Sequence, residues 1–258
     1  MGRGSSKVGG GGGGSLSSRI ANAGTLQQAM KIAEKNGIHL DSGVLKDVAD
    51  EKLIKDGLAE IAWMKDEFPI LKGENIKIIS DPNYKGAYMY SKAGEGTIAY
   101  AGFSPTNTKQ NSGAYYISAN LTDRNGFTDS PQGTTLKHVT THEMTHQLVR
   151  ATCNEMVKRQ TNGKLTSGNK SIHDAYSEYI VKTAYNSIPK KERGRKSLAG
   201  MKKQISKYAH SGGNGETLAE AMADYRANGP KAKPLSKAIY NTLKTETTSS
   251  GISKLVGK

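Results

Sequence analysis

Apolar residues recur at helical spacing in two segments near the N-terminus. The segment 25–37, TLQQAMKIAEKNG, starts at Thr25, a residue type that caps helix N-termini, and stops at Gly37. The segment 44–69 keeps the same spacing until Pro69, which does not fit a helix interior. Both segments are therefore predicted to be α-helices.

The spacing changes after residue 75, where short runs rich in β-branched and aromatic residues replace the helical pattern. These runs are 76–80, 87–91, 97–103 and 114–121. Gly, Asn and Pro residues separate them, as is typical of strands joined by turns. The pattern predicts one small, mostly antiparallel sheet.

Helical spacing returns after residue 133 and continues almost to the C-terminus. The predicted helices are 134–160, 171–187, 196–209, 215–228 and 234–246. The order of helices, then a sheet, then helices, without an internal repeat, predicts an α+β fold.

Glycine and serine dominate residues 1–18, which are predicted to form a disordered tail. Residues 19–258 are predicted to be a single domain, in which 19–133 supply helices and sheet and 134–258 form a helical half. No segment is apolar enough to span a membrane, and no export signal is visible. The only cysteine, Cys153, excludes an internal disulfide and a thiolate-rich zinc cluster.

The net charge of +14 is concentrated in the second half of the chain. Residues 131–258 hold 22 Lys and Arg against 9 Asp and Glu, whereas residues 1–130 hold 15 against 14. Such an excess indicates either a solvated basic surface or an anionic partner, such as nucleic acid or an acidic protein segment. No aromatic-basic recognition motif accompanies the charge.

The stretch 141–148, THEMTHQL, contains an H-E-x-x-H pattern within a predicted helix. His142 and His146 are four residues apart, so their imidazoles lie on one helix face and can share a zinc ion at about 2.0–2.1 Å. Glu143 is placed to accept a proton from a water that zinc has made acidic. The alternative is a structural helix that carries surface histidines.

Two histidines leave the coordination of zinc incomplete, so a third ligand is required. The metzincin pattern is excluded, because Val149 and Thr152 occupy the positions where it needs Gly and His. A carboxylate from a later helix remains as the candidate third ligand.

Two later helices carry acidic residues four apart. One has Asp174 and Glu178, where a solvated helix face is the stronger interpretation. The other has Glu216, Glu220 and Asp224 among small and apolar residues, which indicates a packed face. One acid of this second helix is expected to bind zinc and the next to orient a ligand histidine.

Three stretches of the second half resemble one branch of the zinc metallopeptidases. THEMTH, KYAHSGGNGETLAEAMADY and PLSKAIYNTL are similar to the anthrax lethal-factor-like branch, whose domains occur in phage-encoded proteins and bacterial toxins. The resemblance covers about residues 110–245 and implies a zincin-like fold of the gluzincin type. It also implies a phage- or prophage-encoded protein that acts in the bacterial cytoplasm or is associated with the phage particle.

The resemblance implies a role for each of six residues. His142, His146 and Glu216 become ligands of Zn²⁺, and Glu143 becomes the general base. Glu220 becomes a partner outside the coordination sphere, and Tyr208 becomes a hydrogen-bond donor that helps stabilise the oxyanion. The chain departs from the family in the Gly-rich stretch before Glu216 and in an extra helix between the histidines and that glutamate. A shifted register, with Glu220 as ligand and Asp224 as partner, therefore stays open.

The function expected from these residues is that of a zinc-dependent endopeptidase acting on a protein or peptide substrate. The alternatives are a non-catalytic basic structural or assembly protein on a zincin fold, and metal-assisted hydrolysis of a bond other than a peptide. Tyr115, Tyr116 and Ser118, on the last predicted strand, either pair with extended substrate or simply pack in the sheet.

Overall fold

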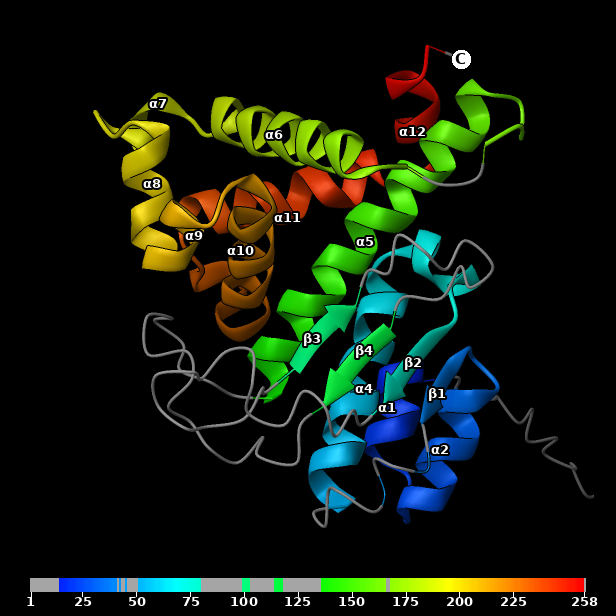
Figure 1. Ribbon diagram of the computed structural model, residues 1–258. Helices are drawn as coiled ribbons and strands as arrows, with labels where there is room; N and C mark the ends of the chain where they lie inside the picture. The colour runs from blue at the N-terminus through cyan, green and yellow to red at the C-terminus, as the bar shows by residue number, and fades with distance from the viewer. Residues whose placement is uncertain are drawn as a thin grey trace, which may run out of the picture.

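A computed structural model describes most of the helical chain and a small sheet. The described residues are 14–40, 42, 45, 51–79, 99–102, 114–117, 136–165 and 168–257. The architecture is α-rich, with one four-stranded sheet beside the N-terminal helices, and a larger group of C-terminal helices (Figure 1).

The N-terminal helices and the sheet form one side of the molecule. Their elements are α1 Leu16–Ala21, α2 Leu26–Glu34, β1 Ile38–Leu40, α4 Glu51–Glu67, η1 Pro69–Gly73, β2 Ile76–Ile79, β3 Ala99–Gly102 and β4 Ala114–Ile117. Thr25 caps α2 as predicted, because its hydroxyl accepts a hydrogen bond from the backbone N–H of Gln28. After α2 the chain turns at Gly37, whose φ of +70° favours glycine.

The prediction of a mostly antiparallel sheet was wrong. The strand order is β1-β2-β4-β3, in which the first two pairs are parallel and only β3 and β4 run antiparallel. The physical reason is the crossover helix α4 between β1 and β2, which returns the chain to the same end of the sheet. The predicted strand 87–91 lies outside the described residues.

Strand β4 lies in the interior of this sheet, with β2 on one side and β3 on the other. The backbone of Tyr115 and Tyr116 is therefore already paired on both sides, which supports the alternative in which these residues simply pack in the sheet. Ser118 lies outside the described residues.

The C-terminal helices follow the predicted ones closely with one exception, apart from two short helices, 190–193 and 249–255, that the sequence pattern did not predict. They are α5 Leu136–Gln160, α6 Lys170–Ser187, α7 Lys190–Arg193, α8 Leu198–Ile205, α9 Lys207–Ser211, α10 Asn214–Asn228, η4 Gly229–Lys231, α11 Pro234–Glu246 and α12 Ser249–Leu255. The exception is the predicted helix 196–209, which breaks at Ser206. Its backbone is extended there, and its hydroxyl accepts from the N–H of Ala209 to begin α9.

Helix α5 connects the two sides of the molecule. It packs against α4 and β3 at one end and runs past α10 and α6 toward α12 (Figure 1). Its buried side chains, such as Met144 and Leu148, belong to the same apolar core as Ile61 of α4 and Leu218 of α10. This packing holds α5 and α10 side by side, and both helices carry the candidate site residues.

The N-terminal tail ends earlier than predicted, because α1 begins at Leu16. The backbone N–H groups of Leu16 and Ser17 donate to the Asp66 carboxylate, and Ile20 is fully buried. Within the described ranges, no helix has the length and apolar character needed to cross a membrane.

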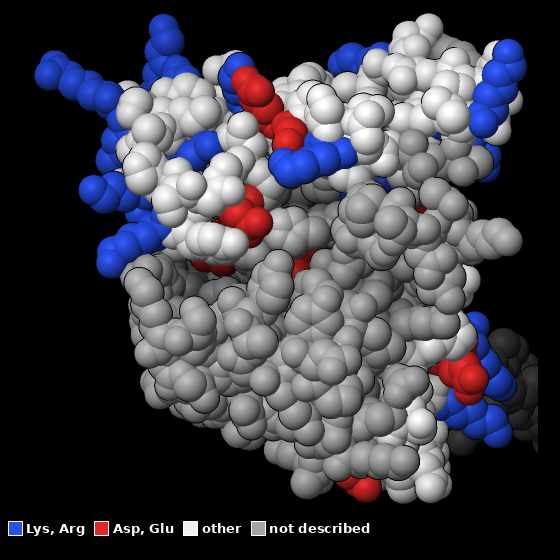
Figure 2. Space-filling view, in the orientation of Figure 1, with Lys and Arg blue, Asp and Glu red and all other residues white. Residues whose placement is uncertain are grey.

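The excess of positive charge is visible on one face of the molecule. Lys and Arg side chains gather at the upper left of Figure 2, where α7 and α8 lie in Figure 1. The segment 190–207, which contains both helices, holds eight Lys and Arg residues and one Glu.

Candidate metal centre

Three histidines of α5 line up along the face that meets α10. His138, His142 and His146 are four residues apart, so each lies about one turn from the next. The ring centroids are 6.4 Å apart for His138 and His142, and 5.1 Å apart for His142 and His146. The facing helix α10 contributes Glu216 and Glu220, which are also one turn apart.

The first cluster joins His142, His146 and Glu216. One oxygen, Oε2 of Glu216, lies 3.0 Å from Nε2 of His142 and 3.5 Å from Nε2 of His146. Ligand atoms that are each about 2.0–2.1 Å from a tetrahedral zinc ion lie about 3.3 Å from one another, so these separations match a zinc site. All three candidate ligand atoms lie within 4.8 Å of each other.

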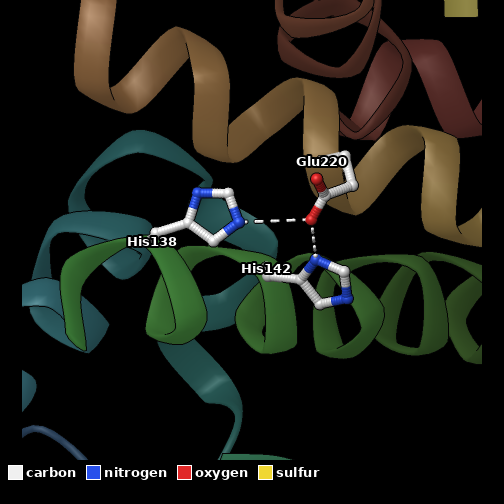
Figure 3. Close-up of side chains that lie close together, drawn as sticks. All are labelled: His138, His142 and Glu220. Atoms are coloured by element: carbon white, nitrogen blue, oxygen red, sulfur yellow. Dashed lines mark hydrogen bonds and ion pairs between the residues drawn. The ribbon is translucent and has the colours of Figure 1, made fainter. Parts of the chain in front are cut away.

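The second cluster joins His138, His142 and Glu220 on the buried side of the same face (Figure 3). Oε1 of Glu220 accepts a hydrogen bond from Nδ1 of His142 at 2.9 Å and from Nε2 of His138 at 3.2 Å. An ionised carboxylate only accepts, so both rings donate. These three buried residues could hold a metal ion, and in the structure they are joined by hydrogen bonds.

Solvent access separates the two clusters. The side chains of His138 and Glu220 are 2% and 1% exposed, whereas those of His146 and Glu216 are 30% and 23% exposed. A catalytic metal keeps a coordination position open to water, and of the two clusters only His142–His146–Glu216, called the open cluster below, has partly exposed members. The hydrogen bond from His142 Nδ1 to Glu220 also fixes that ring with Nε2 facing the open cluster.

The electrostatics of the open cluster fit a cation. Burial alone lowers the pKa of His142, but contacts with Glu216 and Glu220 outweigh burial and raise it to about 10. Burial raises the pKa of Glu216, yet contacts with His142 and His146 hold it below its ordinary value. Oε2 of Glu216 is buried without a hydrogen bond of regular geometry to any described residue. A divalent ion would satisfy this oxygen and replace the proton that His142 holds.

Tyr208 and Glu143 complete the surroundings of His142. The Tyr208 ring stacks on the His142 ring, with centroids 5.9 Å apart, and 39% of Tyr208 is exposed. Burial, together with the charge of Glu216, raises the pKa of Tyr208 above its ordinary value, so its hydroxyl stays protonated. The charge of Glu143 also raises the pKa of His142 and the pKa of Tyr208.

A cavity of about 510 Å³ adjoins the open cluster. His146 and Glu216 line it together with the next turn of α5, residues 212–215 and one face of α6. The site therefore has room for a ligand next to its exposed members.

The other acidic residues that the sequence offered are engaged elsewhere. Asp224, the partner in the shifted register, accepts from the Asn228 side chain at 2.7 Å and from the backbone N–H of Lys233 at 2.9 Å. Asp174 pairs with Lys170, and Glu178 pairs with Lys182, on an exposed face of α6. The geometry thus places Glu216 beside Nε2 of His142 and His146, and Glu220 beside Nδ1 of His142.

The sequence pattern did not indicate the part played by His138, a residue of α5 for which core or surface packing was the expectation. Its spacing of one turn from His142 was visible in the sequence. The pairing was not, because its partner Glu220 lies on another helix. A second missed feature is Glu60 of α4, which accepts from Thr141 at 2.7 Å and from Nε of Arg226 at 2.6 Å. This buried carboxylate ties α5 and α10 to α4 beside the site.

Comparisons of the chain with models of protein families, with curated proteins and with solved structures gave no significant match.

Proposed function

We propose that the protein is a zinc-dependent endopeptidase of the gluzincin type, in which His142, His146 and Glu216 hold the ion. The observation that carries the proposal is the convergence of both Nε2 atoms on one Glu216 oxygen, at 3.0 and 3.5 Å, in a partly open position. A zincin-like fold and a phage or prophage origin belong to the same proposal and rest on the sequence resemblance alone.

Each remaining residue has a defined task in this proposal. When bound, zinc supplies a water molecule of lowered pKa and polarises the substrate carbonyl. Glu143 accepts the proton released during attack and later delivers it to the departing amine. The protonated Tyr208 hydroxyl donates a hydrogen bond to the developing oxyanion. Glu220 accepts from Nδ1 of His142, which keeps Nε2 directed at the ion.

The proposal is tested by combining metal analysis with a digestion assay. Purified protein should contain about one zinc ion per chain, and it should cleave denatured proteins or a peptide library until a chelator is added. Glu143→Gln should lower the cleavage rate by about a hundredfold to ten-thousandfold while zinc stays bound. Glu155→Gln, on the same helix but paired with Arg159 at 2.8 Å, is the matched control and should cleave normally.

The outcomes separate this proposal from its alternative. Zinc that binds at the open cluster without any cleavage across a broad peptide library would favour a non-catalytic basic structural or assembly protein. Cleavage that persists in Glu143→Gln would reject the assigned general base.

A further inference from the structure

We propose that the surface of α7, α8 and their connecting turn binds an acidic segment of the polypeptide substrate. This basic face is formed by Lys190, Lys191, Arg195, Lys196 and Lys203, all of which are exposed. The inference rests on the proposed peptidase function, because it assigns a substrate class to the same site.

The basic face has no internal neutralisation. Its five side chains make no ion pair with any acidic side chain in the described part of the protein. Glu192 is the one acidic residue between positions 190 and 207. Like charges on adjoining turns repel one another, so an anionic partner that neutralises them gains free energy.

The basic face is held in a fixed shape, because α6 anchors the turn between α7 and α8. The Tyr185 hydroxyl donates to the backbone carbonyl of Lys196 at 3.0 Å, and the Arg193 guanidinium lies 4.6 Å from the Tyr185 ring centroid. The turn passes through Gly194, whose φ is +60°, and the Ser197 hydroxyl caps α8. Charges held in place bind an extended partner at a smaller entropic cost than charges on a mobile tail.

Helix α8 of the basic face is connected to the elements that carry the candidate metal centre. Helix α8 leads through Ser206 directly into α9, which carries Tyr208 against the His142 ring. Nζ of Lys202, on α8, donates to the side chain of Asn214 at 2.6 Å, and Asn214 begins the helix that carries Glu216. Because α8 contacts both α9 and α10, which carry residues of that centre, we infer that one extended peptide spans both regions.

The chemistry of this surface favours a polypeptide over a nucleic acid. Proteins that bind single-stranded nucleic acid combine basic residues with exposed aromatic rings on which bases stack. On the basic face the Tyr185 ring lies under Arg193, and the partly exposed Tyr208 ring lies against His142 at the metal centre and not among these lysines. Carboxylates of Asp and Glu side chains need no such stacking surface and pair directly with Lys and Arg.

The test measures binding separately from catalysis. A fluorescent peptide with a run of glutamates is titrated onto the full chain in the presence of a chelator, and fluorescence anisotropy gives the dissociation constant. The triple substitution Lys190→Glu, Lys191→Glu, Lys196→Glu should weaken binding about tenfold or more at low salt. The matched control changes Lys31, Lys35 and Lys72 to Glu. These lysines are also exposed but lie far from the basic face in the sequence, so the dissociation constant should change less than about twofold.

The same titration gives the results that would overturn the proposal. Wild-type binding should weaken steeply as ionic strength rises from about 0.01 to about 0.15 M, because salt screens these charges. Equal loss in both triple variants would show that only net charge matters. Tighter binding of an oligothymidylate than of the acidic peptide would assign the surface to nucleic acid. All these measurements exclude metal, so a failed peptidase assay does not affect them.

Discussion

Replacing His138 with phenylalanine tests whether this buried histidine positions the metal ligand His142. The Glu220 carboxylate is 1% exposed, and its Oε1 accepts one hydrogen bond from each ring. Its other oxygen has no hydrogen-bond partner among the described side chains. Phenylalanine fills a similar volume but donates no hydrogen bond, so Glu220 would keep a single donor on Oε1.

The structure sets the expected magnitude of this change. A hydrogen bond to a buried charged group contributes about 1.5–3 kcal/mol, so the free energy of unfolding should fall by about that amount. Substituting groups that orient a metal ligand weakens metal binding by about ten- to a hundredfold. His138 acts on His142 through Glu220, so the lower end, about tenfold, is expected for zinc.

Zinc affinity is measured by competition with a chromogenic chelator, and stability by urea denaturation of the metal-free protein. The exposed His210 provides the matched control, and His210→Phe should change neither quantity by more than about 0.5 kcal/mol. A loss of stability with unchanged zinc affinity would refute the reasoning, because His138 would then contribute to folding alone.

Three further predictions concern the rest of the fold. Burial lowers the pKa of Lys65 from 10.5 to about 8. Between these two pH values the unfolded state therefore binds more protons than the folded state. The free energy of unfolding of the wild type, relative to that of Lys65→Met, should rise as pH increases from about 8 to about 10.5. A difference between the two proteins that does not change with pH would contradict this prediction. Burial raises the pKa of Cys153 to about 12, so a thiol reagent should modify Cys153 only as fast as the protein unfolds, and rapid modification of folded protein would refute its burial. Arg226→Met should lower the free energy of unfolding, measured by urea denaturation, by about 3 kcal/mol or more, because the Glu60 carboxylate would keep only Thr141 as a donor among its hydrogen bonds described above. Adding Glu60→Gln should recover part of this loss. If the effects of the two substitutions were strictly additive, the result would argue against the pairing of Arg226 with Glu60.

The helices of the second half could be predicted well because their signals are local. Helices α5 and α10 begin within two residues of their predicted starts, since apolar spacing and turn residues are read directly from the sequence. The break at Ser206 was missed because the apolar spacing continues across it, while the capping bond of its hydroxyl forms only in the folded chain.

The sheet was harder to predict, because strand direction is a property of the whole chain. Strand β1 has three residues, too few for an alternating pattern, and its parallel pairing with β2 depends on the path of α4. Alternation within a strand indicates which face is buried but carries no information about the direction of its neighbour.

The candidate site was predictable on α5, whereas on α10 the sequence pattern indicated the acidic face and only the resemblance indicated which glutamate takes which role. The spacing of His142 and His146 is a local pattern, and α5 presents both rings on one face. That Glu216 rather than Glu220 faces Nε2 of His142 depends on the register between α5 and α10, to which the Glu60 contacts contribute. That register cannot be predicted from local sequence patterns, and the pairing of His138 with Glu220 was missed for the same reason.

The most direct test of the central claim is a zinc titration of the wild type and of the Glu216→Ala and His146→Ala variants, with circular dichroism to verify folding. The account predicts about one tight site in the wild type and affinity weaker by about a hundredfold or more in each variant. Folded variants that bind zinc as tightly as the wild type would contradict the account, because the ion would then be held elsewhere.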